Sequence, residues 1–181
     1  MNERRLLSRF RQRDKEAFDV LFARHGEAVL AFARRLTGSC ADAEDLMQET
    51  FLAAYQGVER FGGRARLSTY LIAIAVRRWR DQQRKPRHET VALLDEHDTS
   101  LHAPHPKDAP TENQALAGIV YRAALAQLDD PLKEAFLLVA AEGLTHKEAA
   151  QVLQIPLGTL KWRVAEAMRR LRIALTEEPL P

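Results

Sequence analysis

Basic side chains near the C-terminus have the spacing of a helix that binds DNA. Residues 144–172 read as two short helices on either side of a break near Pro156 and Gly158. A short helix, a tight turn and a second helix with a basic outer face form the helix-turn-helix pattern, in which the second helix enters the major groove. An ordinary helical hairpin with a solvated basic face is the alternative. The cations on the outer face are Lys161, Arg163, Arg169, Arg170 and Arg172.

Turn signals give this motif its predicted boundaries. Thr145 with Glu148 three residues later is a capping-box pattern, so the first helix should begin there. Gly158 or Thr159 is the predicted N-cap of the second helix. The residues that then share its apolar face are Leu160, Val164, Ala167 and Met168.

A second group of basic residues ends a helix predicted at residues 67–80. The first half of this helix is apolar on nearly all sides and should be buried. The second half is basic, it follows a Gly/Arg loop at residues 59–66, and Tyr70 and Trp79 are interleaved with it. Cations beside aromatic rings suit phosphate binding together with stacking on unpaired bases. The alternative is a solvated helix end whose cations interact favourably with the helix dipole.

Carboxylates gather on a helix predicted from Ser39 or Asp42 to about residue 56. The helix dipole favours acidic residues near the start of a helix by ~0.3–1 kcal/mol each, which accounts for Asp42 and Glu44 but not for Glu49. Catalysis or metal binding by paired carboxylates is an alternative, but no His or Cys is placed to complete such a site. The apolar residues predicted to pack on the core are Leu46, Phe51, Leu52 and Tyr55. The residues left on an adjoining polar face, available to a partner, are Asp45, Gln48 and Glu49.

Composition limits the classes of protein that this chain can represent. The 181 residues suit one or two small domains, and an apolar fraction of 46% is enough for real cores. A net charge of +2 means that any charge for binding DNA must be local. With one cysteine, Cys40, no intramolecular disulfide can form, which fits a reducing compartment. There is neither a membrane-length apolar run nor a signal-peptide pattern, so we predict a cytoplasmic protein without membrane insertion.

The rest of the chain is predicted to be scaffold and linker. Residues 3–36 have helical periodicity, with Asp14 as N-cap of a second helix and Gly38 as its C-cap. Residues 86–113 are rich in proline and mildly acidic, which is typical of a linker. Helical periodicity resumes at Asn113, and residues 129–131 mark a further helix start. The linker histidines that invite a metal hypothesis, without a regular ligand set, are His97, His102 and His105.

Three segments in this order resemble a bacterial RNA polymerase sigma factor of the compact, two-domain extracytoplasmic-function (ECF) group. They are DAEDLMQETFLAAY at 42–55, STYLIAIAVRRWRDQQRK at 68–85 and LTHKEAAQVLQIPLGTLKWR at 144–163. The resemblance covers nearly the whole chain. It implies an all-α protein with two small helical domains, residues 1–88 and 114–181, joined by a flexible linker at 89–113. The C-terminal domain would contain the helix-turn-helix at about 144–170.

The resemblance implies a surface for each partner, core RNA polymerase and promoter DNA. Polymerase binding falls on Asp42, Glu44, Asp45, Gln48 and Glu49. The residues implied to bind and open the -10 element are Phe61, Arg64, Arg66, Ser68, Tyr70, Arg77, Arg78, Trp79, Arg80, Arg84, Lys85 and Arg87. Recognition of the -35 element falls on Thr145, Lys147, Gly158, Thr159, Lys161, Trp162, Arg163, Glu166, Arg169 and Arg170. An anti-sigma factor is a further candidate partner, and neither catalysis nor a cofactor is expected.

Four positions depart from the family pattern. Gln154 stands in the turn where Gly is usual, and we expect it to fit with a negative φ. Trp162 replaces a small residue, and Arg77 replaces a usual Asn. Glu166 stands where Arg is frequent, and a Glu can accept a hydrogen bond from a cytosine amino group. These changes predict an altered promoter preference.

The sequence therefore predicts an alternative sigma factor. Two other functions stay open at this point. One is a stand-alone transcriptional regulator that binds DNA through the helix-turn-helix, and the other is a helical module whose basic faces bind acidic proteins. A stand-alone regulator needs neither the acidic helix nor the Gly/Arg loop before a basic helix, so both features favour the sigma factor.

Overall fold

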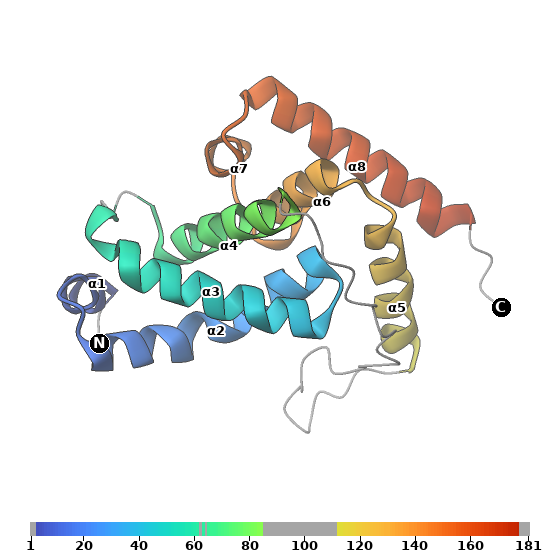
Figure 1. The fold of residues 1–181 in the computed structure, drawn as a ribbon. Helices are drawn as coiled ribbons and strands as arrows, with labels where there is room; N and C mark the ends of the chain where they lie inside the picture. The colour runs from blue at the N-terminus through green and yellow to red at the C-terminus, as the bar shows by residue number, and fades with distance from the viewer. Residues whose placement is uncertain (1–2, 62, 64, 85–111, 178–181) are drawn as a thin grey trace. The chain divides into compact units, whose positions relative to one another are not determined.

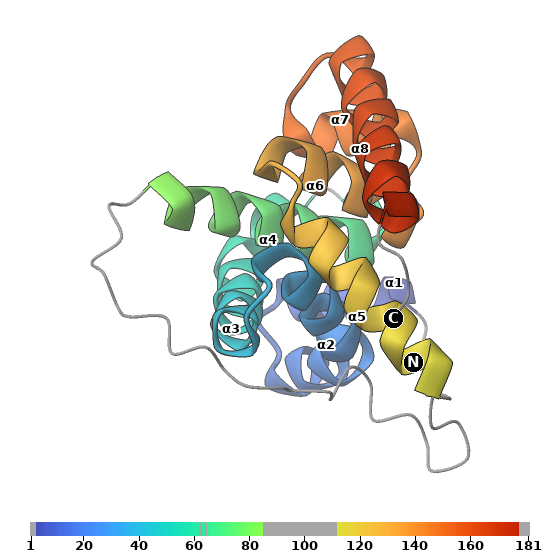
Figure 2. The same cartoon turned by 90° about the vertical axis from the view of Figure 1, so that its right-hand side faces the viewer.

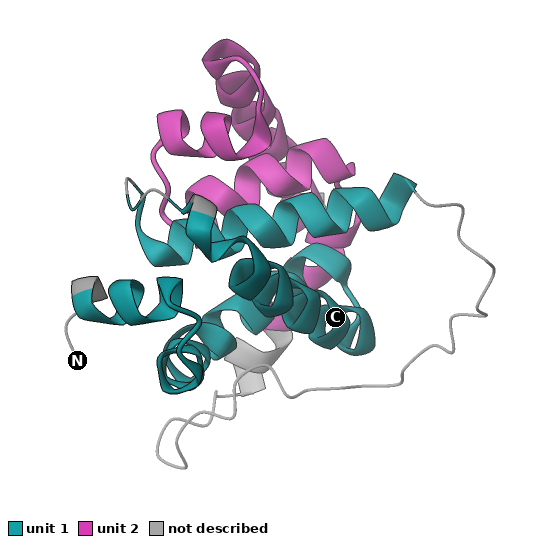
Figure 3. Cartoon of the chain, turned by 60° about the vertical axis from the view of Figure 1, so that its left-hand side comes forward, with its two compact units in different colours: residues 1–88 teal, residues 89–181 magenta. Residues whose placement is uncertain are grey.

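The fold is all-α in the residues that the structure describes. The computed structural model describes residues 3–61, 63, 65–84 and 112–177. The chain divides into two compact units, residues 1–88 and 89–181 (Figure 3). Of the predicted linker, residues 89–111 lie outside the described residues, and residues 112 and 113 already belong to a helix.

Unit 1 is built around a pair of long helices. Its elements are α1 (Glu3–Arg11), α2 (Lys15–Thr37), α3 (Cys40–Gly57), the short 3-10 helix η1 (Val58–Arg60) and α4 (Leu67–Arg84). Helices α2 and α3 lie side by side, and α4 packs against both (Figure 1). An aromatic cluster runs from the core to the surface and joins α1, α2 and α3. Phe10 and Phe51 are buried, Phe18 and Tyr55 are half-buried, and Phe22 is exposed.

The predicted caps of unit 1 are confirmed. The Asp14 carboxylate accepts a hydrogen bond from the backbone N–H of Ala17 at the start of α2. Gly38 ends α2 with φ at +75°, a left-handed conformation that glycine adopts without steric cost. The Ser39 hydroxyl accepts from the N–H of Asp42 and begins α3. These caps fix where the acidic helix begins.

Unit 2 is a bundle of shorter helices packed on one long helix. Its elements are α5 (Glu112–Ala126), α6 (Asp130–Phe136), a π-helical turn η2 (Leu137–Ala141), α7 (His146–Leu153) and α8 (Leu157–Glu177). Helices α5, α6 and α7 all contact α8. Figure 2 labels these four helices. As predicted, α6 begins directly after Asp129, with Pro131 in its first turn.

Candidate nucleic-acid interface

The outer face of α3 is an exposed stripe with an apolar residue at its centre. We call it the α3 stripe, and its exposed members are Asp45, Gln48, Glu49, Leu52 and Gln56. The prediction for Leu52 was wrong, because its side chain is 58% exposed rather than in the core. Thr50 occupies the core instead, where its hydroxyl donates to the Leu46 carbonyl over 2.7 Å. This internal hydrogen bond lets a polar side chain be buried.

A hollow of about 300 Å³ runs between the α3 stripe and the C-terminal half of α4. Arg78 lines this hollow together with Glu49. The structure thus places Arg78 toward the acidic helix, away from the other arginines of α4 with which the sequence grouped it. The full lining is Glu49, Leu52, Ala53, Gln56, Arg78, Asp81 and Gln82.

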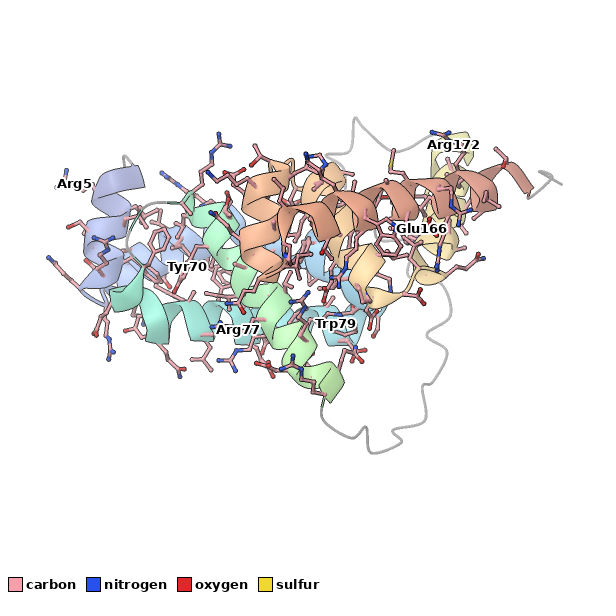
Figure 4. All side chains as sticks on the ribbon, turned by 90° about the horizontal axis from the view of Figure 1, so that it is seen from above. Arg5, Tyr70, Arg77, Trp79, Glu166 and Arg172 are labelled. Carbon is pink, nitrogen blue, oxygen red and sulfur yellow. The ribbon has the colours of Figure 1, made fainter. Side chains whose placement is uncertain are left out.

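The basic face of α4 follows a seven-residue spacing. Tyr70, Arg77 and Arg84 recur every seven residues, so they lie along one side of the helix. Arg77 and Arg84 are exposed, whereas Tyr70, nearer the start of the helix, is half-buried (Figure 4 labels Tyr70 and Arg77). Burial raises the pKa of the Tyr70 phenol, so the ring stays neutral. Of the remaining predicted residues, Arg66 and Ser68 are exposed and Arg80 is half-buried.

Two aromatic residues predicted to face DNA are buried. Phe61 is 6% exposed, and its ring lies 4.4 Å from that of Tyr70, centre to centre. Trp79 is 5% exposed, and its indole nitrogen has no hydrogen-bond partner. Base stacking was predicted for Trp79, whose buried ring is not available for it in this structure. The assignment of Phe61 to the -10 surface stays a prediction. Three other predicted residues, Arg64, Lys85 and Arg87, lie outside the described residues.

The loop that leads into α4 is tied to the N-terminal helices by contacts that the sequence analysis missed. The Arg11 guanidinium donates a hydrogen bond to the Phe61 carbonyl, across 50 residues of chain. Arg13 forms an ion pair of 3.4 Å with Glu59, and its carbonyl accepts a hydrogen bond from the Tyr55 hydroxyl over 3.2 Å. These pairs are far apart in sequence, and periodicity within one helix carries no signal for them.

The helix-turn-helix has the predicted first helix and an unexpected turn. The Thr145 hydroxyl accepts from the N–H of Glu148 while the Glu148 carboxylate accepts from the N–H of Thr145, which confirms the capping box. The expectation for Gln154 was wrong, because its φ is +55°, in the left-handed region. Its N–H caps the end of α7 on the carbonyls of Ala150 and Gln151. The left-handed residue that ends α7 is therefore Gln, at a cost of about 1 kcal/mol relative to Gly.

The second helix starts earlier than predicted. Helix α8 begins at Leu157, so Gly158 and Thr159 lie in its first turn and neither is the N-cap. Leu160, Ala167 and Leu171 form its buried face. Met168 was wrongly predicted to share this face, because it lies at the edge of it and is 47% exposed.

The opposite face of α8 presents a tryptophan among cations. Trp162 is 62% exposed. Elsewhere on α8, Lys161, Arg169 and Arg172 are exposed, while Arg163 and Thr159 are half-buried. A side chain at Gly158, one turn before Trp162, would meet nothing within 4 Å. The first turns of α8 therefore offer one large ring with open space beside it, which is suited to contact with base edges in a groove. Thr145 and Lys147 are exposed on the preceding segment.

Glu166 does not lie free on this face. Its carboxylate accepts hydrogen bonds from Arg169, at 2.9 and 2.7 Å, and from Arg170, at 2.9 Å. These bonds lower the pKa of the Glu166 carboxyl to about 2, with the bonds from Arg169 as the largest cause. The expected hydrogen bond to a cytosine amino group would have to compete with both arginines. In this structure the Glu166 carboxylate binds protein cations.

The described residues include no cluster suited to metal binding. Within them, no three His, Cys, Asp or Glu side chains gather in a way that could hold a metal ion. The histidines of the metal hypothesis, His97, His102 and His105, lie outside this part of the chain. None of the helices in the described ranges is long and apolar enough to span a membrane.

Comparison with known proteins identifies the two units. Sigma-70 region 2 matches residues 21–89, and Sigma-70 region 4 matches residues 119–171. The chain is 30% identical to the ECF RNA polymerase sigma-E factor of Haemophilus influenzae over 175 residues, which cover 92% of each protein. It is 32% identical to the RNA polymerase sigma factor CarQ of Myxococcus xanthus over 171 residues, which cover 94% of this chain and 96% of CarQ.

A solved structure agrees with the sequence comparisons. The sigma factor RpoE from Bartonella quintana, in complex with the anti-sigma factor NepR, has 28% identity and a TM-score of 0.68. The similarity covers 90% of this chain and 98% of that one. The chain therefore belongs to the sigma-70 family of RNA polymerase sigma factors, in its ECF group. It is an alternative sigma factor, a transcription initiation factor without enzymatic activity, and this decides against both other functions that the sequence left open.

Proposed function

We propose that three separate surfaces divide the work of initiation. The α3 stripe binds core RNA polymerase, the basic face of α4 holds the opened -10 element, and α7 with α8 reads the -35 element. The observation that supports this division is the separation of charge. The α3 stripe is acidic with an apolar centre, whereas the exposed faces of α4 and α8 are basic. Because the partner is polymerase and its promoter, we place the protein in the cytoplasm.

The α3 stripe has the composition of a protein-binding surface. Protein interfaces have an apolar centre that is desolvated on binding and a polar rim that excludes water. Leu52 supplies the apolar centre, and Asp45, Gln48 and Glu49 surround it. The matching surface of the polymerase should be basic with an apolar pocket. Asp42 and Glu44, at the start of α3, extend the negative charge.

Core binding tests this surface directly. Glu49→Lys and Leu52→Ala should each weaken binding to core polymerase about tenfold or more, because one reverses a rim charge and the other removes the central anchor. Asp19→Lys is the matched control, since Asp19 is an exposed carboxylate of α2 in the same unit. Equal affinity of all three variants and the wild type in a fluorescence titration would remove the α3 stripe from the proposal.

Run-off transcription tests the function as a whole. Core polymerase with this protein should start transcripts at promoters that core polymerase alone ignores. A promoter can be obtained by selection from a library with randomised -35 and -10 elements. The same selection by the protein without polymerase should enrich little, because its DNA-binding surfaces are divided between two units and its net charge is only +2.

We also propose that an anti-sigma factor holds this protein inactive. The support is the structural similarity to RpoE, which was solved with the anti-sigma factor NepR. A tagged copy purified from unstressed cells should carry a second protein that blocks run-off transcription when it is added to the holoenzyme. Recovery of the tagged protein with core polymerase alone, under every growth condition tested, would contradict this.

A further inference from the structure

Four charged side chains in unit 2 form one continuous chain of hydrogen bonds. Asp129 accepts from Arg170 over 2.9 Å, across 41 residues of sequence. Arg170 also donates to Glu166, which accepts two further bonds from Arg169. These hydrogen bonds thus connect the start of α6 to the middle of α8, where Figure 4 labels Glu166.

The carboxylates of Asp129 and Glu166 both bind arginine side chains of α8. Asp129 occupies the N-cap position of α6, yet its side chain makes no capping hydrogen bond to that helix and binds Arg170 instead. The Glu166 side chain is only 17% exposed, and both of its oxygens are occupied. Neither group is placed to meet a base without first releasing an arginine.

The two guanidinium groups retain donors for a ligand. A guanidinium has five N–H donors in a rigid fork. Within unit 2, Arg169 uses its Nε and one terminal nitrogen on Glu166, and Arg170 uses its Nε on Glu166 and one terminal nitrogen on Asp129. Both arginines line a hollow of about 240 Å³ between α5 and α8, beside Gln127. The remaining donors of a fixed fork suit the oxygens of a phosphate.

We propose that Glu166 is a positioning residue, which together with Asp129 holds Arg169 and Arg170 as a clamp for a backbone phosphate of the promoter. This rests on the proposed function, in which α8 binds the -35 element. Holding the two long side chains before binding reduces the rotamer entropy that the complex must otherwise lose. The low pKa of Glu166 keeps its carboxylate charged throughout the physiological range, so the clamp does not depend on pH there.

The experiment compares base preference and affinity in the holoenzyme. Wild type, Glu166→Ala, Glu166→Gln, Arg169→Ala and the double variant Glu166→Ala/Arg169→Ala are each assembled with core polymerase. Each selects from a library randomised in the -35 element, and its affinity for the wild-type promoter is measured by fluorescence anisotropy at one fixed salt concentration. Circular dichroism melting checks the fold of each variant. Asp129→Asn replaces Glu166→Ala if that variant does not fold.

The clamp predicts one pattern of results. Glu166→Ala and Arg169→Ala should each lower promoter affinity about tenfold, the size of one hydrogen bond to a charged group. Both should keep the wild-type base preference at every -35 position, because a phosphate contact carries no sequence information. The loss in the double variant should be much smaller than the product of the two single losses, since the two side chains act as one unit. Glu166→Gln should lose less affinity than Glu166→Ala, because its amide oxygen still accepts a hydrogen bond.

Other patterns would overturn the clamp. If Glu166→Ala and Glu166→Gln lost preference at one base pair while Arg169→Ala kept it, Glu166 would read that base. Multiplicative losses, or unchanged affinity in all variants, would mean that Glu166 does not act through Arg169. If the wild-type holoenzyme selected no -35 sequence at all, both the clamp and the proposed role of α8 would fall. A normal wild-type selection with multiplicative losses would overturn the clamp alone.

Discussion

Helices α4 and α8 each carry a tryptophan among basic residues, and the two rings have opposite environments. Trp79 is 5% exposed and Trp162 is 62% exposed. The difference comes from the position of each tryptophan around its helix axis relative to the buried residues. Trp79 follows the buried residues Ile72 and Val76 at spacings of seven and three, so it lies on their face of the helix. Trp162 lies nearly opposite the buried face of α8 that contains Leu160.

The comparison teaches that basic neighbours do not show what an aromatic side chain does. In both helices the tryptophan is flanked by cations, so composition alone gives the two rings the same interpretation. Helical phase relative to the apolar positions separates them, and that phase is present in the sequence. We expect Trp79 to act through stability and Trp162 to act through recognition.

Stability should show the largest difference between the two tryptophans. Trp79→Ala should lower the free energy of unfolding by about 3–5 kcal/mol, because it removes a large buried side chain and leaves a cavity. Trp162→Ala should change it by less than about 0.5 kcal/mol, as is usual for an exposed position. Urea unfolding followed by circular dichroism measures both. Equal effects of the two substitutions would contradict the assignment of Trp79 to the core.

Much of the fold was accessible from the sequence because its signals are local. Asp14 and Thr145 were predicted as caps and Ser39 as one of two possible helix starts, and each accepts the backbone hydrogen bond of an N-cap. The apolar half of α4 and the polar face of α3 followed from periodicity. Leu52 was missed because a polar residue, Thr50, takes the core position by bonding its own helix.

The features that the sequence did not predict are contacts between residues far apart in the sequence and a strained backbone conformation. The bonds from Arg11 to Phe61 and from Arg170 to Asp129 join residues that are 50 and 41 positions apart. No periodic pattern encodes such pairs. The left-handed conformation of Gln154 was missed because glycine is the usual signal for it. These contacts position the candidate surfaces, so the sequence showed which helices carry them but not how each side chain is held.

The next effect separates promoter opening from promoter reading. Replacing Arg77 and Arg84 together by Ala should impair opening of a duplex promoter about tenfold or more, because two exposed cations that can hold a single strand are lost. A promoter with a bubble already opened at the -10 element should restore most of the activity. Permanganate footprinting on both templates measures this. If the bubble gave no recovery, the arginines would serve general phosphate attraction or folding rather than strand opening.

Trp162→Ala should instead change which promoters are chosen. A lost base contact is worth about 1–3 kcal/mol, so preference at one or two -35 base pairs should relax while opening stays normal. Selection from a library randomised at -35 detects the change, with Met168→Ala as a control on an exposed residue at the edge of the buried face. The preference of the holoenzyme with Trp162→Ala should differ from that of the Arg77/Arg84 variant. Identical profiles would erase the proposed division between α4 and α8.

A smaller effect concerns the turn that positions α8. Gln154 and Arg13 have nearly the same left-handed conformation, with φ of +55° and +58°, one in each unit. Gln154→Gly should raise the free energy of unfolding by about 0.5–1 kcal/mol, because the strain of a side chain in this region exceeds the entropy cost of glycine. Arg13→Gly should raise the free energy of unfolding by less, since it also removes the ion pair with Glu59. Thermal unfolding of both variants tests this, and destabilisation by Gln154→Gly would mean that its side chain makes a contact worth more than the strain.

The smallest effect is the acid sensitivity of the hydrogen bonds between Glu166 and its two arginines. The pKa of Glu166 is about 2 in the folded protein, below its ordinary value of 4.5, because Arg169 and Arg170 bind the charged form. A depressed pKa means that the folded state binds fewer protons than the unfolded state. The stabilisation is therefore fully present above pH 4.5 and is lost as the pH falls from about 4.5 to about 2.

Glu166→Gln removes this titration and so isolates it. The difference in melting temperature between wild type and Glu166→Gln should be constant above about pH 5.5 and should shrink steadily below pH 4.5. Asp14→Asn provides the matched comparison in unit 1, because the Asp14 pKa is also lowered, chiefly by its hydrogen bond with Arg9. For both variants, the difference in melting temperature from the wild type should become smaller as the pH falls. A difference for Glu166→Gln that is the same at pH 7 and at pH 3 would mean that this carboxylate gains nothing from its arginines, and the clamp would lose its electrostatic basis.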